Sequence, residues 1–406
     1  MRHAVDVEVA VVGGGPAGAA VATLVARAGH EVVLLERAPA WRWRACGVFA
    51  SPVARDALAR IGLDEGSLQQ IGISIPAMRL ETPGGARVRL AYGDDGSLQR
   101  SAIGFDRQAL DVALLSLARA AGAQVRESAT LENGNLDGNP TLTIRDASGI
   151  SRLRARIVVG ADGIRSTVAR LAGVARPGRM GDRVALTFHV ADPRRASGPC
   201  DARMVVLDHA YCGLAPVPGG RLNVGIVLAG PRWRAPLARD GAAAVVARIL
   251  RAVPVAVDDQ VAWADAVRCD PIAGAAPMSH RVTRLAGDGW LLVGDAAGFL
   301  DPFTGEGLHR ALISAEIAAA AIHAGLRGQA RALGAYERAM RRRFGAKDIV
   351  SMVLLGLLER PPLFEYAARR LARRAAIRET MSLVMGDLVP ASRALEPRFL
   401  AALLRP

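Results

Sequence analysis

The chain has 406 residues, 51% of them hydrophobic and 22% charged, which describes a folded globular chain large enough for two or more domains and excludes a disordered one. Its formal charge of +14 comes almost wholly from arginines scattered along the chain, and because no nucleic-acid-binding motif accompanies them we expect no nucleic-acid partner. The four cysteines show no CxxC spacing, so neither a metal site nor a disulfide framework is expected. No stretch approaches the ~20 apolar residues that span a bilayer, and the N-terminus lacks the apolar core of a signal peptide, so the expected location is cytoplasmic.

Residues 7–37 indicate a strand, a glycine-rich turn, a helix and a second strand. The first strand is almost continuously apolar, as strands covered by helices on both faces are. Gly13 allows a tight turn, Gly15 lets the backbone approach a diphosphate, and Gly18 lets the helix pack closely. The unpaired N–H groups of the first helical turn attract phosphates. The segment therefore predicts a dinucleotide-binding βαβ unit.

Glu36 ends this unit, 23 positions after Gly13. An acid at this point accepts hydrogen bonds from the adenosine ribose and repels a 2′-phosphate, so the pattern favours FAD or NAD over NADP. Pro16 and Ala17 in the first helical turn, and Arg37 beside Glu36, complete the contacts expected here.

The next elements alternate between helices and strands. A loop at 38–52 holds two Trp, two Arg, Cys46 and Gly47, and lies where loops of open α/β sheets line the ligand crevice. The periodicity predicts a helix at 53–61 ended by Gly62, a hairpin at 78–90, and a helix at 105–121 with Asp106 as its N-cap.

The remainder of the chain contains a strand-rich block and a helical end. Strands are expected at 124–131, 141–146 and 152–163, and again at 290–300. Residues 184–266 are strand-like apart from a helix at 242–253, which suggests an inserted antiparallel sheet. From residue 330 onward the pattern is helical and basic.

Three glycine-containing segments, far apart in the chain, form a set: GGGPAG at 13–18, GADG at 160–163 and GDAAGFLDPFTGEG at 294–307. In this order the chain resembles the FAD-dependent oxidoreductases of the p-hydroxybenzoate hydroxylase and geranylgeranyl reductase type. The resemblance implies an α/β fold (α+β overall): a glutathione reductase-type Rossmann FAD-binding domain, an inserted antiparallel β-sheet substrate domain and a helical C-terminal region. The bounds we assign are 1–75, 102–180 and 270–329 for the FAD domain, 76–101 and 181–269 for the substrate domain, and 330–406 for the helical region.

Motif and resemblance together assign the FAD contacts. They are Gly13, Gly15, Pro16, Ala17, Gly18, Glu36, Arg37, Cys46, Gly47, Arg107, Asp162, Gly294, Asp295, Pro302, Gly305, Glu306, Gly307 and Leu308. By resemblance, Asp295 accepts a hydrogen bond from a ribityl hydroxyl, and Pro302 packs near the flavin ring. Residues 305–308 open a helix whose N–H groups and dipole stabilise negative charge on a reduced flavin. Alternatives remain for two residues: Asp162 also suits a plain turn, and Arg107 also suits a solvated helix face.

Two residues are candidates for catalysis. Cys46 with Gly47 resembles a pair that lies beside the flavin in geranylgeranyl reductase-like members, and nearby Arg42 and Arg44 would lower the pKa of its thiol. The alternative is a small buried apolar residue. Three histidines (His189, His209 and His309) fit structural roles better than catalytic ones, and His309, just after the flavin loop, is the best catalytic candidate among them.

The segment 209–227 resembles a substrate-contacting strand of such reductases. Tyr211 and Pro216 match that motif, but Gly213 and Ala215 replace bulkier residues. This departure argues against an isoprenoid reductase and predicts a differently shaped or wider substrate pocket.

Three functions stay open. The first is a monooxygenase that hydroxylates or epoxidises an apolar aromatic or polyketide-like molecule through a flavin C4a-hydroperoxide. The alternative is a geranylgeranyl reductase-like reduction of C=C bonds in an isoprenoid or lipid, which the Cys46–Gly47 pair favours, and the second alternative is a non-catalytic flavin-binding redox sensor. No second GxGxxG follows, so NAD(P)H, the expected electron donor, would dock on the FAD domain. The basic amphipathic segments at 349–358 and 366–378 suggest peripheral membrane contact, and the oligomeric state is left open.

Overall fold

The parallel strands near the N-terminus form the centre of the first sheet. The computed structural model describes residues 5–93, 100–180, 183–192, 199–254, 267–329 and 331–405. The strands of this sheet are β1 (Val5–Val12), β2 (Val32–Leu35), β8 (Gln124–Arg126), β9 (Thr130–Asn135), β10 (Thr141–Asp146), β11 (Gly149–Gly160), β19 (Ala286–Gly287) and β20 (Trp290–Leu292). Within the described residues their order is β19-β20-β11-β1-β2-β8, with β10 and β9 continuing from β11. The pairs from β20 to β8 are parallel, as the buried strand patterns predict.

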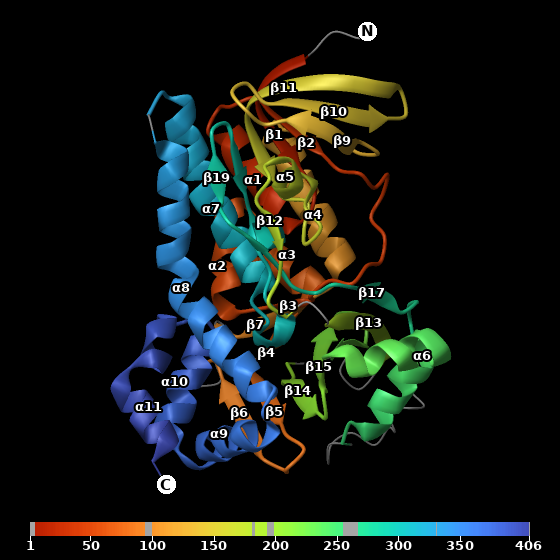
Figure 1. Ribbon diagram of the computed structural model, residues 1–406, viewed down its shortest axis with the longest axis vertical. Coiled ribbons are helices and arrows are strands. Elements are labelled where there is room, and N and C mark those ends of the chain that lie inside the picture. Colours follow the sequence, from red (N-terminus) through yellow and green to blue (C-terminus); the bar gives the residue numbers. More distant parts are fainter. Residues whose placement is uncertain are drawn as a thin grey trace.

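Helices cover one face of this sheet (Figure 1). They are α1 (Pro16–Arg27), α4 (Arg107–Ala120) and α7 (Gly307–Leu326), with α2 (Pro52–Ile61) and α3 (Glu65–Ile71) beside them. Val9 and Val11 of β1 pack on this side, while Ala10 and Val12 face the β9–β10 meander and α5 (Thr167–Leu171). Side chains alternate between the two faces of β1, so this strand contributes apolar residues to two separate cores.

The register of the parallel strands aligns their carboxyl ends. Val12 pairs with both Leu35 and Gly160, and Gly160 pairs with Leu292. These four residues form one row, so the segments that follow them emerge at the same edge of the sheet. The ligand crevice of an open α/β sheet lies at this edge.

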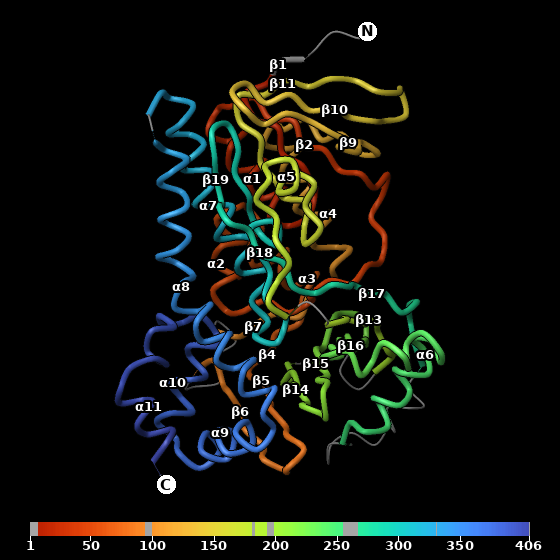
Figure 2. The backbone as a smooth tube through the Cα atoms, viewed as in Figure 1, coloured from red at the N-terminus to blue at the C-terminus, as the bar shows by residue number. Residues whose placement is uncertain are grey.

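The second sheet lies at the other end of the long axis from the β9–β10 meander, as the backbone tube shows (Figure 2). Its strands are β5 (Ala77–Glu81), β6 (Arg87–Ala91), β13 (Val184–Ala191), β14 (Ala202–Leu207), β15 (Ala210–Val217), β16 (Arg221–Leu228) and β17 (Ala273–Ala275). Their order in the described residues is β17-β13-β16-β15-β14-β5-β6. Pairing is antiparallel except between β5 and β14, which are parallel and are joined by a long connection. Helix α6 (Arg234–Ala252) covers one face, and part of the other face, including Met204 and Tyr211, packs against the C-terminal helices.

Smaller strand groups and the C-terminal helices complete the fold. Strands β3 (Phe49–Ala50), β7 (Ala102–Phe105) and β4 (Gly72–Ile75) form a small sheet, and β12 (Ala175–Pro177) pairs with β18 (His280–Val282). The C-terminal helices are α8 (Ala332–Leu358), α9 (Pro361–Arg373), α10 (Ala375–Met385) and α11 (Pro397–Leu404). Helix α8 packs along α7, and α9 and α10 pack on β6. Within the described chain, no helix combines the length and apolarity needed to cross a membrane.

The fold class is as the resemblance implies, whereas several boundaries differ from prediction. The strand expected at 290–300 ends at Leu292, because Gly294 (φ 55°) and Gly298 (φ 131°) turn the chain into a short 3-10 helix, η5 (Gly294–Ala297). The strand expected at 124–131 splits at Ser128 (φ 56°). The helix expected at 242–253 begins earlier, at Arg234, with a kink at Gly241. The part of the predicted substrate sheet at 255–266 lies outside the described residues, and the predicted domain bounds stay a prediction.

Candidate active site

The glycines of the first turn have separate structural roles. Gly13 (φ 106°) could not carry a side chain, because a Cβ there would lie 2.4 Å from the Ala161 carbonyl oxygen. A Cβ on Gly18 would lie 1.9 Å from the Gly13 carbonyl oxygen. The glycine at this position therefore lets the backbone of α1 pack directly against the backbone of the turn. A Cβ on Gly15 meets no described atom within 4 Å. Gly15 therefore borders open space at the N-terminus of α1, where the helix attracts a phosphate.

Glu36 is held by backbone N–H groups. The Gly14 N–H donates to Oε2 at 2.8 Å, and the Ala38 N–H donates to Oε1 at 2.9 Å. Each carboxylate oxygen keeps a lone pair, so the group is oriented for the two ribose hydroxyls that the sequence assigns to it. Arg37 is exposed, and its contact with a cofactor stays a prediction.

Arg107 connects α4 to the loop at 38–52 through hydrogen bonds. Its side chain is only 8% exposed, so the solvated-face alternative is wrong. Its Nη1 donates to the Gly47 carbonyl oxygen at 2.6 Å, while Nη2 lies 2.9 Å from Asp111 Oδ1. Trp41 and Arg44 also donate to Asp111, each at 3.2 Å. Sequence reasoning missed Asp111, although its place one helical turn after Arg107 is a signal for an ion pair.

Cys46 is a thiol and not the expected thiolate. Burial raises the pKa of its side chain, and the opposing charge of Arg107 does not overcome that effect. Arg44 is paired with Asp111, and Arg42 is exposed. Arg44 lowers the pKa of Cys46 as expected, but burial has the larger effect, so the expected net lowering is wrong. The place of Cys46 beside the flavin stays a prediction.

Asp162 and Asp295 are carboxylates that the surrounding protein only partly satisfies with hydrogen bonds. Asp162 Oδ2 accepts the Thr167 N–H at 2.6 Å and so caps α5, but its buried Oδ1 has no hydrogen-bond partner in the described chain. Asp295 follows β20, and no described residue donates a hydrogen bond to its side chain. Burial raises the pKa of Asp295 to about 6, partly offset by the charges of Arg107 and Arg310. Buried carboxyls without partners are costly, and ligand hydroxyl groups would satisfy them.

The start of α7 has the geometry of an anion site. Gly305 (φ 67°) closes the short helix η6 (Pro302–Thr304), and a Cβ on Gly307 would meet no described atom within 4 Å. Glu306 Oε1 accepts hydrogen bonds from Thr304 at 2.7 Å and Ser351 at 3.0 Å. Leu308 points into the first apolar core, so only its backbone is available to a cofactor.

Asp301, just before Pro302, centres a buried network that sequence reasoning missed. Its Oδ2 lies 3.0 Å from Arg183 Nη1, and its Oδ1 accepts the Tyr211 hydroxyl at 2.5 Å and the Phe303 N–H at 2.9 Å. Burial raises the pKa values of both Asp301 and Tyr211. The network joins β15 to the loop before α7. The available signal was the position of an Asp directly before a proline that opens a helix.

His309 is a buried side chain that lies between charged residues. Its Nδ1 lies 2.8 Å from Asp387 Oδ2, and its Nε2 lies 3.0 Å from Arg343. Asp387 also accepts from Lys347 at 2.6 Å, and these two partners lower the pKa of Asp387 although burial opposes them. These contacts tie α7 to α8 and α10. A catalytic role for His309 stays a prediction.

The other two histidines also have structural partners. His189 lies 2.5 Å from Asp270 and packs against the ring of Trp43, whose centroid is 4.6 Å away. His209 is exposed beside Asp208 in the turn between β14 and β15.

The face of the second sheet opposite α6 carries a row of paired residues that includes the small residues Gly213 and Gly225. Thr187 pairs with Gly225, Gly225 with Gly213, and Gly213 with Met204. A Cβ on Gly213 would make only an ordinary contact, 3.5 Å from Met204 Cε. Gly213 and Gly225 remain half-buried at the centre of the sheet. The differently shaped or wider pocket stays a prediction.

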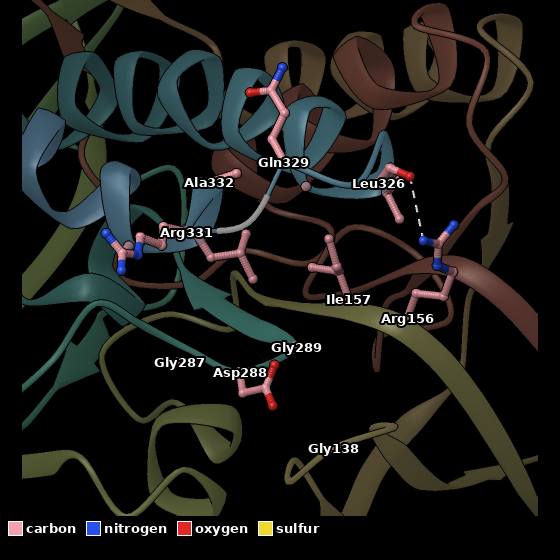
Figure 3. Close-up of a pocket in the computed structure, with 13 residues that line it drawn as sticks. Gly138, Arg156, Ile157, Gly287, Asp288, Gly289, Leu326, Gln329, Arg331 and Ala332 are labelled. Carbon is pink, nitrogen blue, oxygen red and sulfur yellow. Dashed lines mark hydrogen bonds between the residues drawn. The ribbon is translucent and has the colours of Figure 1, made fainter.

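The cavity drawn in Figure 3 is a separate feature. Its volume is about 390 Å³, and it lies between the β19–β20 turn, the start of α8 and a loop that includes Gly138. Gly289 precedes β20, so this cavity opens at the amino end of that strand, away from the row of carboxyl ends. None of the predicted site residues lines it.

The chain was compared with known proteins. The profile of the family described as "FAD binding domain" matches residues 6–350. Digeranylgeranylglycerophospholipid reductase 2 of Methanopyrus kandleri is 30% identical over 326 residues, covering 77% of this chain and 76% of that protein. Menaquinone reductase of Mycolicibacterium smegmatis is 28% identical over 394 residues, covering 94% and 92%.

Solved structures share the fold. The flavin-dependent halogenase CmlS superposes with a TM-score of 0.75 at 24% identity, covering 85% of this chain and 63% of the halogenase. Likeness at this identity shows architecture alone. The family match covers most of the chain, and the open space beside Gly15 and Gly307 fits FAD. The chain therefore belongs to the FAD-binding-domain family, within the superfamily of FAD-dependent oxidoreductases that includes the p-hydroxybenzoate hydroxylase and geranylgeranyl reductase-like enzymes.

Proposed function

We propose that this FAD-dependent oxidoreductase saturates C=C bonds in the isoprenoid chain of a lipid or a quinone. The observation that carries the proposal is the similarity, over at least three quarters of the chain, to proteins named as reductases of such molecules. The monooxygenase alternative draws on likeness of fold to enzymes such as the halogenase, and fold alone does not decide the reaction. The similarity to reductases outweighs the argument that Gly213 and Ala215 raise against this function.

The chain's own residues supply the binding chemistry. The N-terminus of α1 with Gly15 would hold the diphosphate, Glu36 the adenosine ribose, and Asp295 the ribityl chain. When bound, FAD supplies the two-electron transfer that C=C reduction needs. The N–H groups at Gly307 would stabilise negative charge on the reduced ring.

The substrate side combines an apolar wall with one buried hydroxyl. Met204, Tyr211 and Phe303 belong to one apolar cluster with the C-terminal helices, which suits a hydrocarbon chain. Saturation of one C=C bond adds a hydride, which bound reduced FAD would supply, to one carbon and a proton, which would come from solvent, to the other. Burial and the carboxylate of Asp301 raise the pKa of Tyr211 well above its usual value, so its oxygen keeps the proton. We propose that Tyr211, positioned by Asp301, orients the reacting end of the substrate.

The electron donor is a further part of this proposal. NAD(P)H would dock transiently on the FAD domain, since the sequence contains no second GxGxxG. A protein donor is the competing source, and the reduction rates of the bound flavin with NADH, with NADPH and with neither distinguish the two.

The experiment that tests the function is product analysis without oxygen. FAD-loaded protein is incubated anaerobically with dithionite and a geranylgeranylated phospholipid or a menaquinone in detergent. The proposal predicts products that gain two hydrogens in the isoprenoid chain for each bond saturated, measured for menaquinone after its quinone head has been reoxidised. Products that form only under ¹⁸O₂, with the label incorporated, would establish the monooxygenase instead, and no product under either condition would favour the redox sensor.

A further inference from the structure

We propose that the surface formed by α9 and α11 docks on an anionic phospholipid bilayer. We call this surface the α9–α11 face and define it by Leu363, Tyr366, Leu400 and Leu404. Their side chains are 51%, 38%, 38% and 67% exposed. Of the ten large hydrophobic residues that are exposed in the described chain, seven lie between residues 349 and 404. Scattered exposed apolar residues need no explanation, but such a concentration marks an interaction surface.

Hydrogen bonds hold the two helices of this face together. The Tyr366 hydroxyl donates to the Leu404 carbonyl oxygen at 2.9 Å, and Arg374 donates to the carbonyl oxygen of Ala402. Leu363 and Tyr366 lie one turn apart on α9, and Leu400 and Leu404 lie one turn apart on α11. The exposed side chains therefore sit on a preformed surface.

The charge around this face complements an anionic lipid surface. Residues 360–405 contain nine arginines and four acidic residues. Arg370 lies beside Tyr366, with its Nη2 3.1 Å from the hydroxyl, and Arg405 directly follows the exposed Leu404. Glu365 on the same helix is already paired with Arg369 and Thr82. Basic residues beside exposed apolar side chains favour anionic bilayers, and each adds an electrostatic contribution that salt screens.

Apolar packing continues from this face to the loop before α7. Phe364, the neighbour of Leu363, is buried, and its ring centroid lies 6.1 Å from that of Phe303. Phe303 in turn packs edge-on against Tyr211 at 5.1 Å. The docking surface and the proposed substrate wall thus share one apolar cluster. The docking itself is independent of the reaction, but uptake of substrate from the bilayer rests on the proposed function.

Vesicle flotation tests the docking itself. The full-length, FAD-loaded protein is mixed with vesicles of phosphatidylcholine alone or of phosphatidylcholine with phosphatidylglycerol, at low and at physiological salt. We expect binding to the mixed vesicles, weaker at higher salt, and roughly tenfold weaker binding to phosphatidylcholine alone. The double variant Leu363→Ser/Leu404→Ser should reduce binding about tenfold or more, because each leucine loses its burial in the lipid. Arg370→Gln/Arg405→Gln should reduce binding to the mixed vesicles only.

The matched control is Ile150→Ser. Ile150 is 56% exposed but lies in the β10–β11 hairpin, at the opposite end of the molecule (Figure 1). Its substitution should leave vesicle binding unchanged. Equal binding by wild type and Leu363→Ser/Leu404→Ser would overturn the proposal. A concentration-dependent dimer that this double variant abolishes, without vesicle binding, would overturn it in favour of a second copy of the chain.

A substrate pair separates this inference from the proposed function. Leu363→Ser/Leu404→Ser should keep wild-type FAD content and wild-type reduction of a short, water-soluble prenyl compound, and lose activity on substrate embedded in vesicles. If wild type binds vesicles but reduces neither substrate, the proposed function fails and the docking surface stands.

Discussion

The hydroxyl of Tyr211 donates to Asp301 over 2.5 Å, which joins the second sheet to the loop before α7. Tyr211→Phe removes this bond but leaves Asp301 its contacts with Arg183 and the Phe303 N–H. We expect unchanged FAD content and a kcat lower by about a hundredfold, with a smaller change in KM, because the group orients the reacting substrate. Steady-state kinetics with detergent-solubilised substrate measure this, with Tyr366→Phe as the matched control. If kcat falls equally in Tyr211→Phe and Tyr366→Phe, Tyr211 does not orient the substrate.

The first glycine turn allows folding and cofactor binding to be separated. A side chain at Gly15 meets open space and its backbone angles suit any residue, so Gly15→Val should leave the unfolding midpoint nearly unchanged while blocking the diphosphate. Gly18→Ala should destabilise the protein by about 2 kcal/mol or more, because its Cβ collides with the Gly13 carbonyl oxygen. Flavin absorbance and thermal melts of flavin-free protein measure both. FAD-saturated Gly15→Val protein would contradict the assigned diphosphate site.

We expect Asp295 to lower the stability of the flavin-free protein and to strengthen FAD binding. Its pKa of about 6 lies above its ordinary 3.8, so the folded protein holds this proton more tightly than the unfolded chain does. Stability contributed by this group therefore falls as pH rises from about 4 to about 6, and the full cost is present at pH 7. We expect Asp295→Asn to raise the free energy of unfolding of the flavin-free protein by up to about 3 kcal/mol at pH 7 and to change little at pH 4.

The same substitution should weaken FAD binding about tenfold, because an amide oxygen accepts hydrogen bonds less strongly than a carboxylate. Urea denaturation at the two pH values and fluorescence titration with FAD measure the two effects. If Asp295→Asn is less stable than wild type at pH 7, burial of the Asp295 carboxylate does not destabilise the protein.

Gly213 should set the width of the substrate pocket. Gly213→Ala introduces a Cβ at an ordinary 3.5 Å from Met204, so we expect nearly wild-type kinetics. Gly213→Trp would fill the space over Gly225, and we expect KM for bulky substrates to rise about tenfold or more at unchanged FAD content. If Gly213→Trp and Gly213→Ala behave alike, the row of small residues does not line the pocket.

The conformation of the glycine turn and the position of Glu36 could be predicted because both depend on residues close together in the sequence. Gly13, Gly15 and Glu36 lie within one βαβ unit, so the spacing of the motif fixes their geometry. Asp106 as an N-cap and Gly62 in the left-handed conformation were likewise read from neighbouring residues, and both are confirmed.

The protonation of Cys46 and the network at Asp301 depend on tertiary contacts. The sequence places Arg42 and Arg44 close to Cys46, but not the burial that raises its pKa or the Asp111 carboxylate that engages Arg44. The sequence likewise cannot show that Arg183 and Tyr211, far apart in the chain, meet at Asp301. Long-range partners of this kind decide charge and orientation at the site.

Anaerobic reoxidation of the flavin tests the central claim most directly. The purified FAD-loaded protein is reduced with dithionite, oxygen and excess reductant are excluded, and a geranylgeranylated lipid, which has no quinone head to accept the electrons, is added in a stopped-flow instrument. We predict that the absorbance of oxidised flavin returns at a rate that depends on substrate concentration, with one C=C bond saturated per flavin. A flavin that stays reduced until oxygen enters would contradict the account.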